Sequence, residues 1–567
     1  MIQKNNLEPP QTQVAILVQE GLTLHQQGRL EEAQVIYEQL LLLQPDQFDA
    51  LQLLGVLFFQ IKKYSQAVEL LSKALKINPN HVGAFNNRGN ALKELKRFDE
   101  ALASYDQAII IDPDHVGSQN NRGIALKELK RFDEALASYD QAIKLKPEYV
   151  DAYSNRGNLL QELKRFDEAL ASYNQAIAID PNHSYAYSNR GSVFQDLNRF
   201  EDALASYDRA IVLNPNHAGT FSNRGIVLQG LKRLDEALAS YEQALKIDPN
   251  LITAHYNLSL FNLMRGNFKA GWQGYEWRWL DKDFDSEPLK SNKPAWDYQK
   301  TEQRLLVWAE QGVGDQISFG NLLLELLEDV PNILVQIDKR LIPIFTRSLP
   351  KINFYSDDIK LPESDYDTHI AIGSLGKYLR NHEEDFLKSK NKFFLSDKKR
   401  TQAIRKELSV SKKLICGISW KSSSGVSGVK RSLSLEKVAT VFDPEKISLV
   451  NLQYGDITED INLLKSNSKV DLIQYESIDN FNDLDGFASL IDACDFIVTV
   501  DNSTIHLSSA LRKKTFLLLP YVSEWRILFN RDTSPWYPST RLYRQEKIND
   551  WDSALEKLKS DLLKLIN

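Results

Sequence analysis

A short turn with two glycines and an aspartate, Gly312-Val313-Gly314-Asp315, holds the first residues that could do chemistry. The glycines let the backbone pass close under a ligand, and the turn delivers Asp315 to the start of a helix. A carboxylate there can take a proton from an attacking hydroxyl as a general base. It can equally cap its helix, which aspartate does well. The sequence leaves both interpretations of Asp315 open.

Two other phosphate-binding patterns match this turn poorly. A dinucleotide fingerprint with Asp338 on the ribose would need a third glycine where the chain has Ile317. A P-loop would need a GK[ST] triplet, and none follows the turn.

A second candidate is the segment Asp501-Asn502-Ser503-Thr504, which follows an apolar run ending at Val500. A helix that begins here offers free backbone N–H groups and the positive end of its dipole, so a diphosphate would fit. The hydroxyls of Ser503 and Thr504 would assist. His506, one turn further, could donate to a phosphate. The alternative is plain capping by Asp501 or Ser503 with a structural histidine.

Three further polar residues belong to the same region. Lys421 opens a loop rich in serine and glycine at the carboxyl end of a strand, which is where parallel sheets bind ligands. A cation there would offset the charge of a leaving diphosphate. Arg431 is a second candidate cation, and a solvated pair with Lys430 is its alternative. Gln453, at the end of another strand, is a candidate contact for a nucleoside.

These candidates require strands that end at one edge of a sheet. Apolar runs predict buried strands, and the segments between them predict helices; the strands are 305–309, 333–337, 368–372, 414–420, 447–452, 495–500 and 515–519. The main predicted helices are 316–327, 340–348, 487–493, 501–511 and 550–566. This alternation indicates parallel sheets. We predict two small Rossmann-like α/β halves, 304–398 and 412–567, with a cleft between them.

The preceding part of the chain repeats a 34-residue unit about eight times, with prolines from Pro45 to Pro249 and glycines from Gly21 to Gly225 in step. Such a period indicates a solenoid. Small residues eight and twenty positions into a unit let two helices cross closely, and the proline ends the second helix. The pattern resembles the tetratricopeptide repeat. We predict a lead-in at 1–13, an all-α superhelix at 14–285 and a linker at 286–303.

Position six of six successive repeats is asparagine: Asn87, Asn121, Asn155, Asn189, Asn223 and Asn257. In a tetratricopeptide array this position faces the groove, and an amide can bind the backbone of an extended peptide whatever its sequence. The ladder resembles that of eukaryotic O-linked N-acetylglucosamine transferases, which hold protein substrates in this way. The alternative is recent duplication, because KELKRFDEALASYDQAI recurs nearly verbatim and would have copied the asparagine with it.

Four stretches of the second part carry a further resemblance: WAEQGVGDQISF, GISWKSSSG with KRSLSL, VNLQYGD, and DFIVTVDNSTIHLSSAL followed by EWRILFNRDTSPWYPSTRLYRQ. Together they resemble the glycosyltransferase domain found behind tetratricopeptide arrays in bacteria, which is similar to the heptosyltransferases of the GT-B class. The resemblance implies Asp315 as base, the segment from Asp501 to His506 at the donor, and no metal or cofactor beyond a nucleotide-diphosphate sugar. Asn321, where relatives often carry arginine, and a short first half depart from that pattern.

Composition and charge indicate which partners and which compartment to expect. A net charge of −7 over 567 residues gives no reason to expect nucleic acid or an anionic membrane as partner. No apolar run is long enough to span a membrane, and the start lacks the apolar core of a signal peptide. Only Cys416 and Cys494 occur, which suits a reducing cytoplasm.

Taken together, these features predict an inverting glycosyltransferase that moves a sugar from a nucleotide sugar to a polypeptide acceptor held by the array. One alternative is a non-catalytic, protein-binding scaffold with a degenerate transferase domain. Another is a transferase for a surface glycan or a lipid-linked sugar, with the array recruiting partners.

Overall fold

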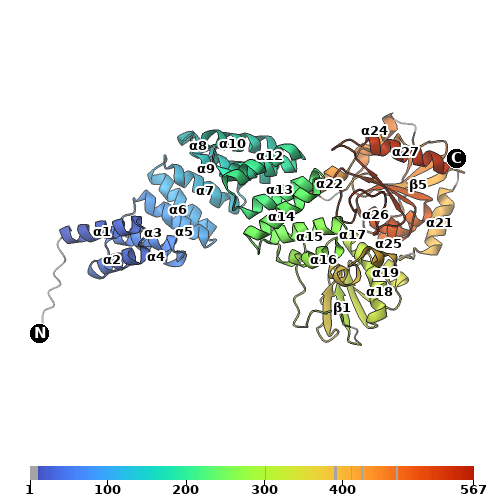
Figure 1. The fold of residues 1–567 in the computed structure, drawn as a ribbon, viewed down its shortest axis with the longest axis horizontal. Helices are drawn as coiled ribbons and strands as arrows, with labels where there is room; N and C mark the ends of the chain where they lie inside the picture. Colours follow the sequence, from blue (N-terminus) through green and yellow to red (C-terminus); the bar gives the residue numbers. More distant parts are fainter. Residues whose placement is uncertain are drawn as a thin grey trace. The chain divides into compact units, whose positions relative to one another are not determined.

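The computed structural model describes residues 11–299, 302–388, 393–409, 412–422, 425–467 and 470–566. Residues 1–10 of the predicted lead-in, and Ser423 and Ser424 of the loop after Lys421, lie outside these ranges. The chain divides into two compact units, Met1–Asn216 and His217–Asn567 (Figure 1). The division falls earlier than the predicted linker at 286–303, because the last helix pairs of the array group with the α/β part.

The first unit is all-helical and consists of antiparallel helix pairs. Its helices are α1 (Gln11–Gln26), α2 (Leu30–Leu43), α3 (Phe48–Gln60), α4 (Tyr64–Ile77), α5 (Val82–Glu94), α6 (Phe98–Ile111), α7 (Val116–Glu128), α8 (Phe132–Leu145), α9 (Val150–Glu162), α10 (Phe166–Ile179), α11 (Ser184–Asp196) and α12 (Phe200–Leu213).

The small residues and tyrosines of the repeat meet where the two helices of a pair cross. A Cβ added to Gly123 would lie 2.5 Å from Cε1 of Tyr139, so only glycine lets the ring fit there. Tyr139 is buried, and so is the repeat alanine Ala135. The predicted close crossing of the two helices is therefore confirmed.

The turn between the two helices of a pair needs one residue in the left-handed region. Glycine takes this place at Gly28, but lysine takes it in most pairs, including Lys96 and Lys130 with φ near 58°. Lysine pays a steric cost in this region that glycine does not. Most of these turns therefore contain a strained lysine, and glycine at the same position would relieve the strain.

The second unit begins with two more helix pairs and a short 3₁₀ helix. These are α13 (Ala218–Gly230), α14 (Leu234–Ile247), α15 (Ile252–Met264), α16 (Phe268–Tyr275) and η1 (Glu276–Leu280). Trp272 of α16 is 1% exposed and packs against Trp525 and Trp536 of the α/β part. Its Nε1 donates to the backbone oxygen of Arg380 at 2.8 Å, so the last pair shares one core with the sheets.

Residues 286–299 of the predicted linker pack against the first sheet through Trp296. Trp296 is 5% exposed, and its backbone N–H donates to His369 O at 2.9 Å. Ala295 forms a parallel bridge with His369. The prolines and charges that suggested a loop are present, but a buried tryptophan anchors the segment.

The first sheet has four parallel strands in the order β3-β2-β1-β4. The strands are β1 (Leu305–Trp308), β2 (Ile333–Ile337), β3 (Asn353–Ser356) and β4 (Thr368–Ala371), joined by α17 (Val313–Gly320), α18 (Leu322–Asp329) and α19 (Ile342–Ser348). The helix predicted at 316–327 is interrupted at Asn321. After β4 come η2 (Ile372–Leu375), α20 (Gly376–Leu379), η3 (Glu383–Leu387) and α21 (Lys398–Leu408).

The second sheet has six parallel strands in the order β10-β9-β8-β5-β6-β7. They are β5 (Leu414–Ile418), β6 (Ile447–Asn451), β7 (Leu472–Ile473), β8 (Phe496–Val500), β9 (Thr515–Leu519) and β10 (Thr540–Arg544). Its helices are α22 (Gly425–Arg431), α23 (Leu435–Ala439), α24 (Thr458–Asn467), α25 (Leu484–Ala493), α26 (Ser503–Ala510) and α27 (Asp552–Ile566).

The predicted parallel sheets are confirmed, and α17 of the first packs against α26 of the second. Within the described ranges, no helix is both long and apolar enough to cross a membrane.

Candidate functional site

The turn from β1 to α17 lies against the start of α26. A Cβ added to Gly314 would lie 2.6 Å from Cδ2 of His506, so this glycine makes room for the imidazole ring. The glycine was expected to make room for a ligand; here the histidine of the other sheet takes that space. The two helices that follow β1 and β8 can therefore approach within van der Waals contact, and their ends form one wall.

Asn502 caps α26. Its Oδ1 accepts from the backbone N–H of Thr504 at 3.0 Å, and its Nδ2 donates to Ser419 Oγ at 2.5 Å and to Lys421 O at 3.0 Å. Capping by Asp501 or Ser503, the plain alternative, is therefore wrong. Thr504 is buried, with its hydroxyl 3.4 Å from Ser419 Oγ. Its expected contact with the donor diphosphate is not met, because this hydroxyl faces the core.

A cleft of about 330 Å³ opens between the two sheets at the carboxyl ends of their strands. This is within the range of volumes that hold small-molecule ligands. Six residues expected at the donor line it: Gly312, Gly314, Arg431, Asp501, Ser503 and His506. Tyr454, Asn480, Phe481 and Arg340 also line it, and sequence reasoning named none of them as contacts.

Three expected donor residues do not line the cleft: Thr504, which is buried beside Ser419, Lys421 and Gln453. The ammonium of Lys421 pairs with the Asp460 carboxylate at 2.5 Å, so its charge is already neutralised. The Gln453 side chain accepts from the backbone N–H groups of Trp420 and Lys421, at 3.0 and 2.8 Å. Gln453 therefore shapes the end of β5, and the cation of the cleft on this side is Arg431.

Asp315 is held by an arginine that sequence reasoning did not single out. Its Oδ1 accepts from Arg526 Nη2 at 2.5 Å, and the other arm of Arg526 donates to Glu524 Oε2 at 2.7 Å. The guanidinium is buried and stacks on the ring of Trp525, 4.3 Å from its centroid. Asp315 itself does not line the cleft.

Glu524 is the second carboxyl of this cluster. Burial raises its pKa to about 7, against the attraction of Arg526 and with a further rise from Asp501. Its Oε1 is enclosed and makes no hydrogen bond within the described residues. A carboxyl that titrates near neutral pH is suited to proton transfer. Its signal in the sequence is a pair of opposite charges flanking a tryptophan, Glu524-Trp525-Arg526, just beyond a strand.

Asp501 is almost fully enclosed at the floor of the cleft, with 2% of its surface exposed. Its Oδ2 makes no hydrogen bond within the described part of the chain, and Arg431 Nη1 lies 3.4 Å away. Burial raises the pKa of this carboxyl, and Arg431 opposes the rise. An enclosed carboxylate oxygen without a donor is costly unless a ligand supplies one.

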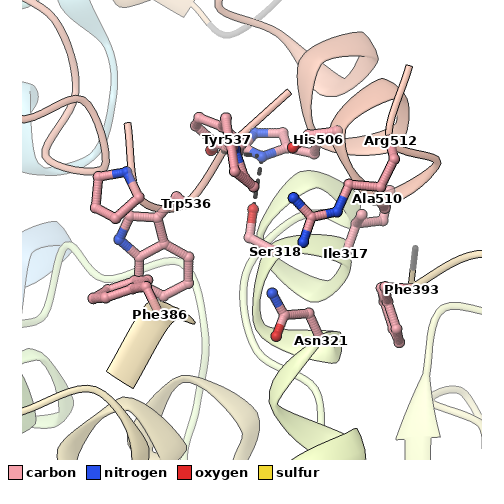
Figure 2. Close-up of a pocket in the computed structure, with 13 residues that line it drawn as sticks. Ile317, Ser318, Asn321, Phe386, Phe393, His506, Ala510, Arg512, Trp536 and Tyr537 are labelled. Atoms are coloured by element: carbon pink, nitrogen blue, oxygen red, sulfur yellow. Dashed lines mark hydrogen bonds between the residues drawn. The ribbon is translucent and has the colours of Figure 1, made fainter. Parts of the chain in front are cut away.

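His506 lines both the cleft and a second, smaller cavity of about 30 Å³, and Figure 2 shows the smaller cavity. Its Nδ1 lies 2.7 Å from Ser318 Oγ and 3.0 Å from the hydroxyl of Tyr537. Burial, and after it the charge of Arg526, lower the pKa of His506 to about 3. The ring is therefore neutral at physiological pH. When Nδ1 accepts from either hydroxyl, its proton sits on Nε2 as a neutral donor.

The six asparagines lie half-buried on the first helix of successive pairs. Several of them use the amide nitrogen within the array. Asn121 Nδ2 donates to Asn86 and Asn90 at 3.1 Å, Asn155 Nδ2 to Asn120 at 2.9 Å, and Asn189 Nδ2 to Asn158 at 2.9 Å. In the second unit, Asn257 Nδ2 donates to Ser222 Oγ at 3.3 Å. The ladder thus presents mainly amide oxygens, which accept but do not donate.

Within the described ranges, no group of three or more His, Cys, Asp or Glu side chains could hold a metal ion.

Comparison with known families identifies the repeats. The tetratricopeptide repeat family matches residues 82–115, 150–183 and 184–217. A family described as TPR repeat matches 125–164 and 230–263, and a further tetratricopeptide repeat family matches 24–87. The first part of the chain therefore consists of tetratricopeptide repeats, a scaffold that supports protein–protein interaction.

Among curated proteins, the chain is similar to Protein FlbA of Caulobacter vibrioides, with 29% identity over 321 residues. The match covers 53% of this chain and 53% of that protein, so the chain spans about half the length of the relative it matches.

Two solved structures show likeness to the chain. A tetratricopeptide repeat protein from Parabacteroides merdae has 19% identity and a TM-score of 0.38, over 44% of this chain and 98% of that one. YrrB, described as a TPR protein with an unusual peptide-binding site, has 23% identity and a TM-score of 0.28, over 33% of this chain and 96% of that one.

Proposed function

We propose that the α/β part is a GT-B glycosyltransferase that moves a sugar, with inversion, from a nucleotide-diphosphate sugar to a polypeptide presented by the repeats. The observation that carries the proposal is the cleft at the carboxyl ends of two parallel sheets, with Asp501 at its floor. Its Oδ2 makes no hydrogen bond within the described residues, and sugar hydroxyls are donors of the right kind.

The diphosphate has candidate partners beside Asp501. Ser503 begins α26 and lines the cleft, so the positive end of the helix dipole lies there. Arg431 adds a positive charge and His506 a neutral donor. These groups would stabilise the negative charge that builds up on the leaving diphosphate.

The reaction needs a base for the acceptor hydroxyl. As the acceptor oxygen forms its bond to the anomeric carbon, the bond from that carbon to the diphosphate breaks, and the hydroxyl proton passes to a carboxylate. Asp315 takes this role in the proposal: it directly follows Gly314, which lines the cleft, and Arg526 binds its Oδ1. Glu524, on the other arm of Arg526, is the alternative acceptor because burial raises its pKa to about 7.

The acceptor is proposed to be a polypeptide because the array offers a row of amide oxygens. Such oxygens accept from the backbone N–H groups of an extended chain without reading its side chains. Replacing Asn155 and Asn189 with alanine removes two of the amide oxygens in this row. Peptide affinity should then fall, and an unchanged affinity would contradict the groove. The alternative of a surface glycan or a lipid-linked sugar as acceptor predicts that unchanged affinity.

A scaffold without catalysis remains the second candidate. Two observations favour it: Asp315 already has a partner in Arg526, and Lys421 has one in Asp460. A site whose charges are all paired within the protein has less need of a ligand. Asp501 points the other way, because its Oδ2 makes no hydrogen bond within the described residues, although Arg431 lies 3.4 Å from it.

The deciding experiment measures ligand binding by thermal shift across a panel of nucleoside-diphosphate sugars. All nine tryptophans lie between Trp272 and Trp551, so their fluorescence reports the second unit alone. A sugar nucleotide at 100 times its dissociation constant should raise the unfolding free energy by about 2.7 kcal/mol. Asp501→Ala should abolish the shift.

The matched control is Lys421→Met, on the same side of the sheet but outside the cleft. It should retain the shift given by the wild-type chain. If no member of the panel shifts the wild-type transition, the transferase proposal fails and the scaffold replaces it. If both variants lose the shift, Asp501 has no specific part in binding.

A further inference from the structure

The last helix of the repeat array carries a buried arginine that reaches the turn after β1. Arg278, in η1, has no exposed surface. Its Nε and Nη2 donate to the two carboxylate oxygens of Glu310, both at 2.7 Å. Glu310 lies two positions before Gly312, the first residue of the Gly312–Asp315 segment, and is 3% exposed. The end of the array and the site turn are thus joined by a bidentate, fully buried ion pair.

Glu310 also ties the turn to the neighbouring strand. Its Oε1 accepts from the backbone N–H of Gly373, just after β4, at 2.8 Å. Arg278 Nη2 donates to Ser374 Oγ at 2.8 Å, and that hydroxyl donates to Glu276 at 2.8 Å. Every oxygen of the Glu310 carboxylate therefore has a donor, and these donors come from both the array and the first sheet.

The next residue of the turn is held in the same way. Gln311 has φ 59°, a left-handed conformation that costs energy for a residue with a side chain. Its backbone N–H donates to Ser286 Oγ at 2.7 Å, and its Oε1 accepts from the hydroxyl of Tyr275 at 3.3 Å. Two consecutive residues are thus fixed by groups outside the sheet, and strain of this kind persists only where the surroundings impose it.

The ring partners of Arg278 complete the arrangement. Its guanidinium lies 4.3 Å from the ring centroid of Tyr275 and 4.2 Å from that of Trp279. Stacking and a bidentate fork are properties of arginine that lysine does not share.

We propose that Arg278 is a positioning residue: through Glu310 it sets the turn that carries Gly312, Gly314 and Asp315 in register with His506 and the cleft. The inference rests on the proposed function for its consequence in catalysis, but the positioning itself does not. It makes the last tetratricopeptide pair a structural part of the site and separates it from the pairs that serve only to bind partners.

The first test is hydrogen exchange of the full chain, read at the peptide that covers 309–316. Arg278→Lys should raise exchange there on the order of tenfold, because a lysine cannot hold both oxygens of Glu310. Glu310→Gln, which keeps the size of the side chain but removes its charge, should raise exchange at the same peptide. The matched control is Arg380→Lys, which weakens another buried bidentate pair, that with Glu325 at 2.6 and 2.9 Å. Arg380→Lys should leave exchange at 309–316 unchanged.

The second test is steady-state kinetics with the donor found by the thermal-shift panel. Arg278→Lys should lower kcat on the order of tenfold and leave KM for the donor within about threefold, because the donor contacts belong mainly to the other sheet. Arg380→Lys should change neither constant.

The outcomes separate the two proposals. Unchanged exchange at 309–316 in both Arg278→Lys and Glu310→Gln overturns the positioning role, whatever the activity of the protein. Raised exchange in a chain that binds no sugar nucleotide upholds the positioning role and overturns the transferase. Raised exchange with unchanged kcat shows that the turn is positioned by Arg278 but does not limit the reaction, which overturns the inference for catalysis.

Discussion

The carboxyl of Glu524 should leave a signature in the pH dependence of stability. Burial raises its pKa from an ordinary value of 4.5 to about 7, so the folded protein keeps a proton that the unfolded chain has already lost. Between these two values the stability therefore falls as pH rises. One pKa unit is worth about 1.36 kcal/mol, so the whole interval costs roughly 3 kcal/mol. The side chain is 13% exposed, and solvent screening reduces this figure little.

Glu524→Gln removes the titration and keeps the shape of the side chain. As pH rises from 4.5 to above 7, the unfolding free energy of the wild type should fall by about 3 kcal/mol relative to that of the variant. Urea unfolding followed by tryptophan fluorescence at several pH values measures this difference in the second unit alone.

Glu383→Gln is the control of opposite sign. Its carboxylate pairs with Arg531 on the surface, and that hydrogen bond lowers the pKa of Glu383. This ion pair adds a small amount to the unfolding free energy at neutral pH, and that contribution is lost as pH falls through the lowered pKa of Glu383. If wild type and Glu524→Gln give parallel curves from pH 4.5 to 8, burial does not raise the pKa of Glu524, and the reason for naming it as the alternative base is lost.

Three further predictions concern the array, the junction and the histidine. Lys96→Gly should raise the helix melting temperature measured by circular dichroism, by the equivalent of roughly 1 kcal/mol, because φ is 58° there; Lys93→Gly, inside α5, should lower it. Trp272→Ala should cost the second unit about 3–5 kcal/mol in urea unfolding, and a loss below about 1 kcal/mol would contradict its place in the shared core. The imidazole resonances of His506 should not titrate between pH 8 and about 4, since burial lowers its pKa to about 3. As pH falls, the unfolded chain protonates this histidine near pH 6.5, before the folded protein does. The unfolding free energy therefore decreases below pH 6.5. An NMR titration midpoint near 6.5 would exclude a buried neutral ring.

Strand prediction succeeded where the burial pattern was simple. The runs at 333–337 and 515–519 coincide with β2 and β9, because central parallel strands are apolar on both faces. The edge strand β4 was predicted as the run 368–372, but the other edge strands, β3, β7 and β10, were not. They are short or carry charged residues such as Arg541, since one side of an edge strand faces solvent.

The candidate site was partly readable for a similar reason. Gly312, Asp501, Ser503 and His506 follow the carboxyl ends of strands, and parallel strands bring those ends to one edge. Thr504 obeys the same rule but turns to Ser419, because successive residues at the start of a helix point in different directions. Position in the sequence therefore predicted which segment lines the cleft, but not which of its side chains do so.

The sequence by itself determined the repeat, its helix crossings and the parallel strands, because these depend on periodicity and on contacts between residues close in the chain. Only the tertiary structure decided which charges meet. Arg526 reaches Asp315 across 211 positions, and Arg278 reaches Glu310 from a helix of the array. An ion pair between distant segments leaves no period and no local composition, since its energy arises only after both groups lose their water in the same place. For that reason the partners of Asp315 and Glu310 became visible only in the fold.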